Sequence, residues 1–425
     1  MKQLLAYCLS IILCVSFTGC MENYLDLYPE DKITSASFPE NESDIKLLLN
    51  GVYAQLREKE VYNQGLFGFG ITDGATPNAF NWGTDEVFNK LGAGRLSSSD
   101  GGVVTYRWKR CYEIISRANY LLACMDLVDL SEEAKAKYSG ETHFLRGLAY
   151  SVLAETYGGV PIILTNISTE EARSLKRASL EETWQQALDD YEVAITNLGV
   201  DAPEPGRATK GAALGMKMRA YLYQGKYKEV LSCVEQIDAL KKYGLFHSYE
   251  GLFDPANENN KEVLFDIQYI EGENSQGSYI DQYCGTGTGS WTRGSRYVPT
   301  DDLVAAYETI DGSPVDPENP YENRDPRLGF TAVLPGSYFL GYRFPNYLYP
   351  GGAFNHAGNR LKHLSTRKYR IQDESKLPPS GQSYINDIIL RYADVLLSKA
   401  EAIIETNGSV ADAIAILNRI RTERD

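Results

Sequence analysis

The chain has 425 residues, of which 43% are hydrophobic and 23% charged, a composition typical of one large or two medium globular domains. Its formal net charge is −15. This charge argues against nucleic acid as a partner, because phosphate contacts need clustered Lys and Arg, and also against electrostatic attachment to anionic lipid head groups.

The N-terminal segment predicts export and lipidation. Lys2 is followed by an apolar run over residues 4–17 and by two small residues before Cys20. A basic start and a short apolar segment are typical of a secretory signal peptide, and the segment is too short for a membrane span. The residues before Cys20 resemble a bacterial lipobox, although Phe17 stands where Leu is more usual. We expect residues 1–19 to be removed and Cys20 to carry lipid; the alternative is an ordinary cysteine of a cleaved leader.

Apolar residues at helical spacing predict helices over residues 140–157, 184–198, 209–223, 227–237, 390–405 and 410–420. Gly158 and Pro161 follow the first of these and supply a C-cap and a stop. Residues 218–230 resemble the central part of a tetratricopeptide repeat, with Gly225 at the reversal. We therefore expect a mainly α fold of stacked helix pairs, rather than an unrelated helical bundle.

Two regions lack the helical period, at about residues 60–105 and 243–383. They are rich in Gly, Asn, Pro and aromatics, and the second contains one expected strand at residues 263–269. Loops this long are usually functional or disordered, and their aromatic content argues against disorder. We expect a single domain over residues 20–425, with helical scaffold at about 40–240 and 385–425, few short strands, and a large loop-rich ligand-binding region.

Short motifs along the chain resemble those of the SusD/RagB family of outer-membrane lipoproteins from Bacteroidetes-type bacteria. They occur in the family's order at residues 25–29, 117–119, 140–150, 157–161, 206–210, 311–312, 324–328, 390–397 and 417–421. Residues 117–119 are expected to end an early helix. Arg324, Asp325 and Arg327 are expected to hold a turn.

The resemblance implies tetratricopeptide-like helix pairs with a loop-rich region laid against them. It also implies a binding protein rather than an enzyme, one that caps a SusC-like TonB-dependent transporter on the outer membrane and faces outward. Family members capture glycans or, in the RagB branch, peptides. They usually continue beyond the segment that matches residues 417–421, so the resemblance leaves the last scaffold helices unaccounted for.

A glycan site needs exposed aromatic faces with hydrogen-bonding side chains nearby. Two clusters in the irregular regions meet this need: Asp73, Asn78, Asn81 and Trp82 in the first, and Tyr279, Asp281, Gln282, Tyr283, Trp291, Arg293 and Arg296 in the second. The alternative is that these aromatics anchor the loops to the scaffold. A third aromatic run, over residues 338–349, is a weaker candidate that could instead face the transporter.

The sequence contains none of the motifs expected for a metal site, a hydrolase nucleophile or a phosphate loop. The cysteines show no C-x-x-C spacing, the four His form no H-E-x-x-H, and no G-x-S-x-G motif occurs. Residues 285–290 lack the Lys of a phosphate loop. We therefore expect no metal and no cofactor. A pair of opposed carboxylates for glycoside hydrolysis cannot be identified or rejected among 57 acidic residues, so a hydrolase and a periplasm-facing protein-interaction scaffold stay as alternatives.

Overall fold

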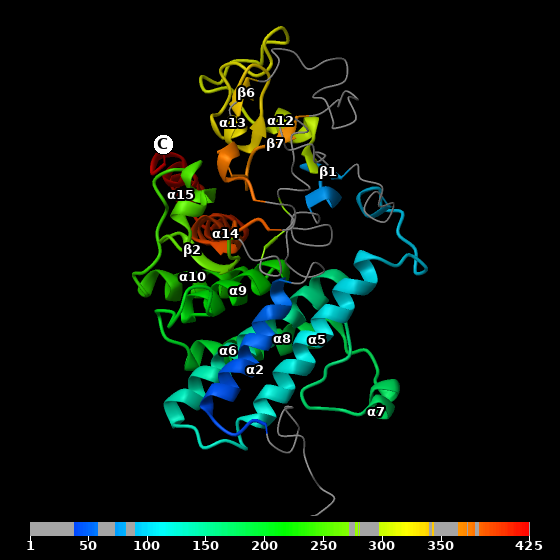
Figure 1. Cartoon of the computed structure of the whole chain (residues 1–425). Coiled ribbons are helices and arrows are strands. Elements are labelled where there is room, and N and C mark those ends of the chain that lie inside the picture. Colours follow the sequence, from blue (N-terminus) through cyan, green and yellow to red (C-terminus); the bar gives the residue numbers. More distant parts are fainter. Residues whose placement is uncertain are drawn as a thin grey trace, which may run out of the picture.

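The computed structural model describes residues 38–57, 73–81, 90–271, 277–278, 280, 297–339, 342–343, 364–371, 373–378 and 382–424. Long helices form a scaffold in the lower and middle parts of Figure 1, and most of the short strands and loops lie above it. The predicted mainly α fold with short strands is confirmed.

The first part of the scaffold consists of long helices that pack against one another: α2 (Glu42–Tyr53), α5 (Val103–Cys124), α6 (Glu132–Tyr157) and α8 (Leu180–Asn197). α6 ends at Gly158, whose φ of 75° suits glycine, as the sequence predicts. The prediction that residues 117–119 end a helix is wrong. α5 continues to Cys124, because Leu121 is buried in the core and no Gly or Pro interrupts this turn.

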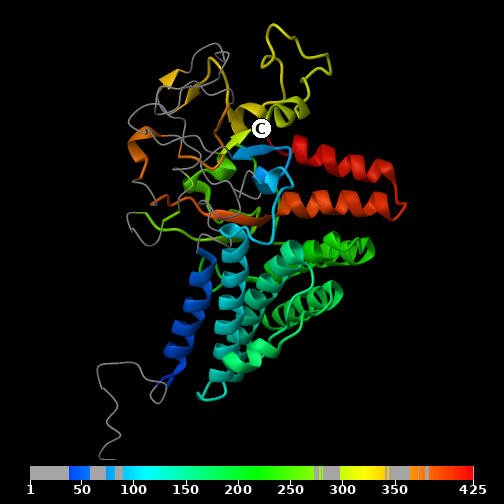
Figure 2. The same cartoon turned by 90° about the vertical axis from the view of Figure 1, so that its right-hand side faces the viewer.

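The scaffold continues with two helix pairs, α9 (Lys210–Tyr223) with α10 (Tyr227–Ala239) and α14 (Tyr392–Glu405) with α15 (Val410–Thr422). Gly225 has a φ of 67° and makes the tight reversal between α9 and α10. α14 packs on α10, and Figure 2 shows both pairs in one stack. Leu390 was predicted to start the fourth helical stretch, but it lies in a strand and the helix begins at Tyr392.

The remaining elements are short. The short helices are α7 (Thr169–Ser174), α12 (Asp301–Ala306), α13 (Arg327–Thr331), η1 (Ala54–Arg57), η2 (Asp73–Ala75), η3 (Gly251–Phe253), η4 (Pro255–Asn257) and η5 (Glu374–Lys376). The described strands form antiparallel pairs: β1 (Ala79–Asn81) with β3 (Tyr297–Pro299), β2 (Val263–Ile267) with β8 (Asp387–Arg391), β4 (Ala332–Val333) with β7 (Ser365–Thr366), and β5 (Tyr338–Phe339) with β6 (Tyr342–Arg343). β2 is the strand that the sequence predicts.

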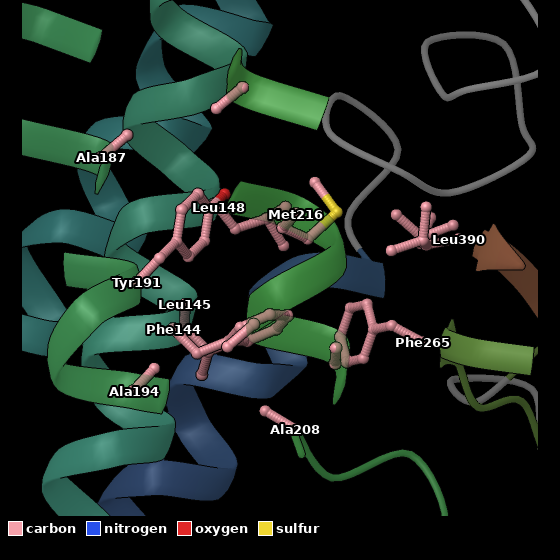
Figure 3. Packing of buried hydrophobic residues seen from close by; sticks show 14 of the residues in the cluster. Phe144, Leu145, Leu148, Ala187, Tyr191, Ala194, Ala208, Met216, Phe265 and Leu390 are labelled. Atoms are coloured by element: carbon pink, nitrogen blue, oxygen red, sulfur yellow. The ribbon is translucent and has the colours of Figure 1, made fainter. Parts of the chain in front are cut away.

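The main hydrophobic core joins the scaffold helices to the β2–β8 pair. Phe144 of α6 packs edge-on against Phe265 of β2, with ring centroids 4.8 Å apart (Figure 3). Gly147 brings α6 close to α8, since a Cβ at this position would lie 3.1 Å from the Ala187 carbonyl oxygen. α6 is therefore in contact with both neighbouring layers, and the strand pair is fixed against it.

A charged network lies inside this core. The Arg146 guanidinium donates two hydrogen bonds to Asp190, at 2.7 Å and 3.0 Å, and a third to the Asn119 side chain at 2.8 Å. Asn119 in turn donates to the Ile163 carbonyl at 3.0 Å. Arg146 is 6% exposed and Asp190 is 1% exposed. The network ties α5, α6 and α8 to the loop that follows α6.

The turn at residues 324–328 is structural, as the sequence predicts. The Arg324 guanidinium donates to the carbonyl oxygens of Val304, Tyr307 and Pro320. Asp325 forms an ion pair with Arg327. These bonds hold α12 and α13 together.

Folding shields two carboxylates beside the β2–β8 pair, those of Glu258 and Asp266, from water. The Asn386 N–H donates to Glu258 at 2.7 Å, and the Asn386 side chain donates to Asp266 at 3.2 Å. Burial raises the pKa of Glu258 to about 7 and that of Asp266 to about 6. Both groups therefore hold a proton more readily in the folded chain than in the unfolded one.

Replacing Asp190 with Ala leaves the Arg146 guanidinium buried without its carboxylate. We expect Asp190→Ala to lose about 3–5 kcal/mol of unfolding free energy, measured by urea denaturation. Asp189→Ala is the matched control, because Asp189 is the adjacent acid on the exposed side of α8, and it should change little. Equal losses in the two variants would contradict the role of the network.

Glu258 makes folding stability depend on pH. Its carboxyl has an ordinary pKa of 4.5 and a folded-state pKa of about 7, so its stabilising contribution is complete below the first value and is lost as the pH rises through the second. The urea midpoint should fall less between about pH 5 and pH 8 in Glu258→Gln than in the wild type. Glu229→Gln, an exposed acid of α10, should follow the wild type. A fall in Glu258→Gln as large as that in the wild type would show that this carboxyl does not contribute.

Candidate functional site

The two predicted ligand-binding clusters are attached to one strand pair. β1 runs antiparallel to β3, which sets Asn81 opposite Tyr297. The Thr300 N–H donates to the Asn78 carbonyl at 3.0 Å and extends this pairing. In the sequence, Trp82 follows β1 directly and the second cluster ends directly before β3. The residues that follow β1 and those that precede β3 therefore leave from the same end of the strand pair, whereas Asp73 and Asn78 precede β1 at the opposite end.

Among the predicted ligand residues, the structure describes Asp73 and Asn78 in full. Asp73 is exposed in η2, and both residues line a cavity. Asn81 takes part in β1 through its backbone. The other predicted residues lie outside the described part of the chain: Trp82, Tyr279, Asp281, Gln282, Tyr283, Trp291, Arg293 and Arg296.

This first cavity has a volume of about 370 Å³ and lies where the loop-rich region meets the scaffold. Arg219 of α9 and Asp394 of α14 line it from the scaffold. Its aromatic surface comes from Tyr249, Tyr307 and Tyr369. Aromatic faces next to charged and amide groups suit a ligand that carries both apolar C–H faces and hydroxyl groups.

The charged groups of the first cavity are mostly paired. Arg219 forms an ion pair with Asp394, and Arg391 pairs with the buried Glu262 at 2.8 Å. Lys368 lies beside Tyr249, with the ammonium 5.5 Å from the ring centroid. Burial acts to raise the pKa of Tyr249, but Lys368 and Arg391 outweigh it and hold that pKa below its ordinary value. The Tyr249 hydroxyl therefore lies close to two cations.

A second cavity, of about 530 Å³, shares Lys368 and Tyr369 with the first. Tyr338 and Phe339, which begin the third predicted aromatic run, line it, while Phe344, Tyr347 and Tyr349 lie outside the described residues. The sequence analysis did not identify the segment 367–370, Arg-Lys-Tyr-Arg, as part of a candidate site. Three cations within four residues of an acidic chain were the signal that could have found it.

No group of three or more His, Cys, Asp or Glu in the described residues is arranged to hold a metal ion. Within the same residues, no helix combines the length and apolar character that a bilayer crossing requires.

Comparison with known proteins gives a consistent result along the chain. A family model described as "Starch-binding associating with outer membrane" matches residues 23–222, and the SusD family model matches residues 261–423. The chain is 26% identical to SusD-like protein P25 of Formosa agariphila, over 99% of this chain and 81% of that protein. It is 24% identical to a SusD-like protein of Bacteroides ovatus, over 95% of this chain and 73% of that one.

Among solved structures, the chain resembles a SusD-like carbohydrate binding protein of Bacteroides fragilis. The TM-score is 0.79 at 26% identity, and the match covers 90% of this chain and 78% of that one. Three observations point to the same family: the sequence motifs, the helical stack and the two family models. The chain therefore belongs to the SusD family.

Proposed function

We propose that this protein captures glycans at the outer face of the outer membrane and delivers them to a SusC-like TonB-dependent transporter. The observation that carries the proposal is the first cavity, which Asp73 and Asn78 of the first predicted cluster line together with three Tyr side chains. Membership of the SusD family and the likeness to a carbohydrate binding protein support it.

The proposed site combines Trp82 with Trp291 as stacking faces for sugar rings. Asp73, Asn81, Tyr279, Tyr283 and Arg293 supply the hydrogen bonds to hydroxyl groups. This division follows from sugar chemistry, because a pyranose presents apolar C–H faces and a polar rim. The first cavity, which Asp73 also lines, offers Asn78 and three further Tyr side chains.

We propose that capture occurs without cleavage. A glycosidase needs a carboxylic acid with a raised pKa next to the bound sugar. Glu258 and Asp266 have raised pKa values, of about 7 and about 6, but the cavity that they line has a volume of only about 10 Å³. A sugar ring does not fit there, so these acids are assigned a structural role.

We further propose that lipid on Cys20 holds the mature protein in the outer membrane with the loop-rich region accessible from outside. The segment before Cys20 has the features of an exported lipoprotein. Two or more acyl chains give the firm attachment that one chain does not. A tethered protein of this kind stays near its transporter.

Loss of either stacking Trp should weaken retention by the glycan. The measurement is native affinity electrophoresis of the lipid-free protein through gels that contain single polysaccharides. We expect one polymer to retard the wild type, and Trp82→Ala or Trp291→Ala to weaken binding roughly 10-fold, the effect of losing one ring–aromatic stack with its buried area. Tyr120→Ala removes an exposed aromatic of α5, 40% exposed, and should bind as the wild type does.

Circular dichroism should confirm that each variant is folded before its mobility is compared. Retention of Trp82→Ala and Trp291→Ala equal to that of Tyr120→Ala would contradict the proposed site. Absence of retardation by every polymer, with binding of peptides instead, would replace glycan capture by peptide capture.

Replacing Cys20 with Ala should release the protein from membranes. We expect the wild type in the outer-membrane fraction and Cys20→Ala in the soluble fraction, because the acyl chains supply the attachment. Protease added to intact cells should cut the wild type. Protection from protease in intact cells, with cutting after lysis, would show that the protein faces the periplasm.

A further inference from the structure

The second cavity shares Lys368 and Tyr369 with the first, but its other lining residues belong to the second cavity alone. It is lined by the segment 367–370, by residues 248–254, by Phe330 and by β5. Its volume of about 530 Å³ is within the range of small-molecule sites. The cavity therefore has room for a sugar residue of its own.

The two carboxylates of this cavity are already engaged. The Arg367 guanidinium donates to Glu250 at 2.6 Å, and the pair forms a salt bridge. Asp254 accepts the Ala256 N–H at 2.8 Å and caps η4. Neither of these two interactions involves Lys368, which lines the same cavity.

Lys368 is surrounded by aromatic rings instead of acids. Its ammonium lies 4.3 Å from the ring centroid of Phe253, 5.2 Å from that of Tyr369 and 5.5 Å from that of Tyr249. The described residues supply no carboxylate within salt-bridge distance of it. Lys368 is partly buried as a residue and lines the cavity, so an anion bound there would lie close to its side chain. Rings hold the cation in position but leave its charge unneutralised.

Arg370 adds a further cation to the same wall. It is 1% exposed, and its guanidinium lies 5.8 Å from the Phe339 ring, which also faces Arg367 at 5.6 Å. Among the described residues, the lining carries three cations, Arg367, Lys368 and Arg370, and two acids, Glu250 and Asp254. These residues are more positive than the chain as a whole, whose net charge is −15. A negatively charged sugar would gain more from these cations than a neutral one.

An exposed aromatic face stands beside these cations. Tyr338 of β5 lines the cavity and is 67% exposed. Phe253 and Tyr369 also line the cavity, and their rings pack edge-on with centroids 4.7 Å apart. A sugar ring could stack on Tyr338 while a charged substituent of the ring reaches Lys368.

We propose that the second cavity binds an acidic sugar residue, with Lys368 as the charge partner of its carboxylate or sulfate group and Tyr338 as the stacking face. This inference rests on the proposed glycan capture and narrows it to acidic glycans. A carboxylate and a sulfate share the oxyanion chemistry that the site recognises, and the test separates them.

The test is isothermal titration of the lipid-free protein with an oligogalacturonide, a sulfated galactan oligosaccharide and the desulfated form of that same oligosaccharide. We expect at least one acidic probe to bind roughly 10-fold or more tightly than the neutral one, with an affinity that falls as salt is added, as for a charge-assisted contact. Which acidic probe binds tells carboxylate from sulfate recognition.

Lys368→Met removes the charge and keeps an apolar stem. It should lose roughly 10-fold or more of the affinity for the acidic probe, with no loss for the neutral probe, and Lys368→Arg should restore part of it. Lys228→Met is the matched control, because it removes the same charge from an exposed site on α10. It should bind as the wild type does. If Lys368→Met does not fold, the Tyr338→Ala variant tests the site instead. The Tyr338 side chain is exposed, and its loss should also weaken binding of the acidic probe.

Equal affinity for acidic and neutral probes, or equal binding by Lys368→Met and Lys228→Met, would overturn the acidic-sugar site while leaving glycan capture intact. Binding of neither acidic nor neutral glycans, here and in the affinity gels, would overturn both proposals. Acidic-probe binding that is lost in Trp82→Ala but unchanged in Lys368→Met and Tyr338→Ala would assign acid recognition to the first site instead.

Discussion

The buried carboxylate of Glu262 joins the helical scaffold to the region that holds both cavities. Glu262 is 0% exposed and accepts hydrogen bonds from Arg391 at 2.8 Å, from the Phe246 N–H at 2.7 Å and from Arg424, which follows the last helix. Arg391 ends β8 and also lines the first cavity. Without this carboxylate, two guanidinium groups would be left in a poorly solvated place without their common partner. The position of one cavity wall therefore depends on a single buried ion cluster.

We propose that the two cavities share the recognition of a glycan. The first lies against the β1–β3 pair, from which the predicted Trp-bearing segments continue, and its cations are largely paired. The second lies beyond Lys368 and Tyr369, which both cavities share, and carries the excess of positive charge. Loops supply the contacts, while the packed helices and the β2–β8 pair hold these loops in place. If a glycan spans both cavities, its sugars in the first cavity would stack on aromatic rings. Its sugars in the second cavity would contact the positively charged side chains.

The elements were largely predictable from the sequence, and the site only in part. The end of α6 at Gly158 and the reversal at Gly225 are local signals, so the sequence alone was sufficient to predict them. The aromatic clusters could be recognised by composition. Their attachment to one strand pair could not, because a single sequence does not record that Asn81 pairs with Tyr297. Lys368 was missed for the same reason, because two of the rings around its ammonium, those of Tyr249 and Phe253, are far from it in the sequence.

The most direct test of the account is hydrogen–deuterium exchange of the lipid-free protein with and without the glycan that retards it in gels. The account predicts that added glycan slows exchange in β1 and β3 and in residues 73–78, with little change in the scaffold helices α6 and α8. Slowed exchange confined to the scaffold helices, with none in β1 or β3, would contradict it. Such a result would show that the helical stack, and not the loop-rich region, forms the binding surface.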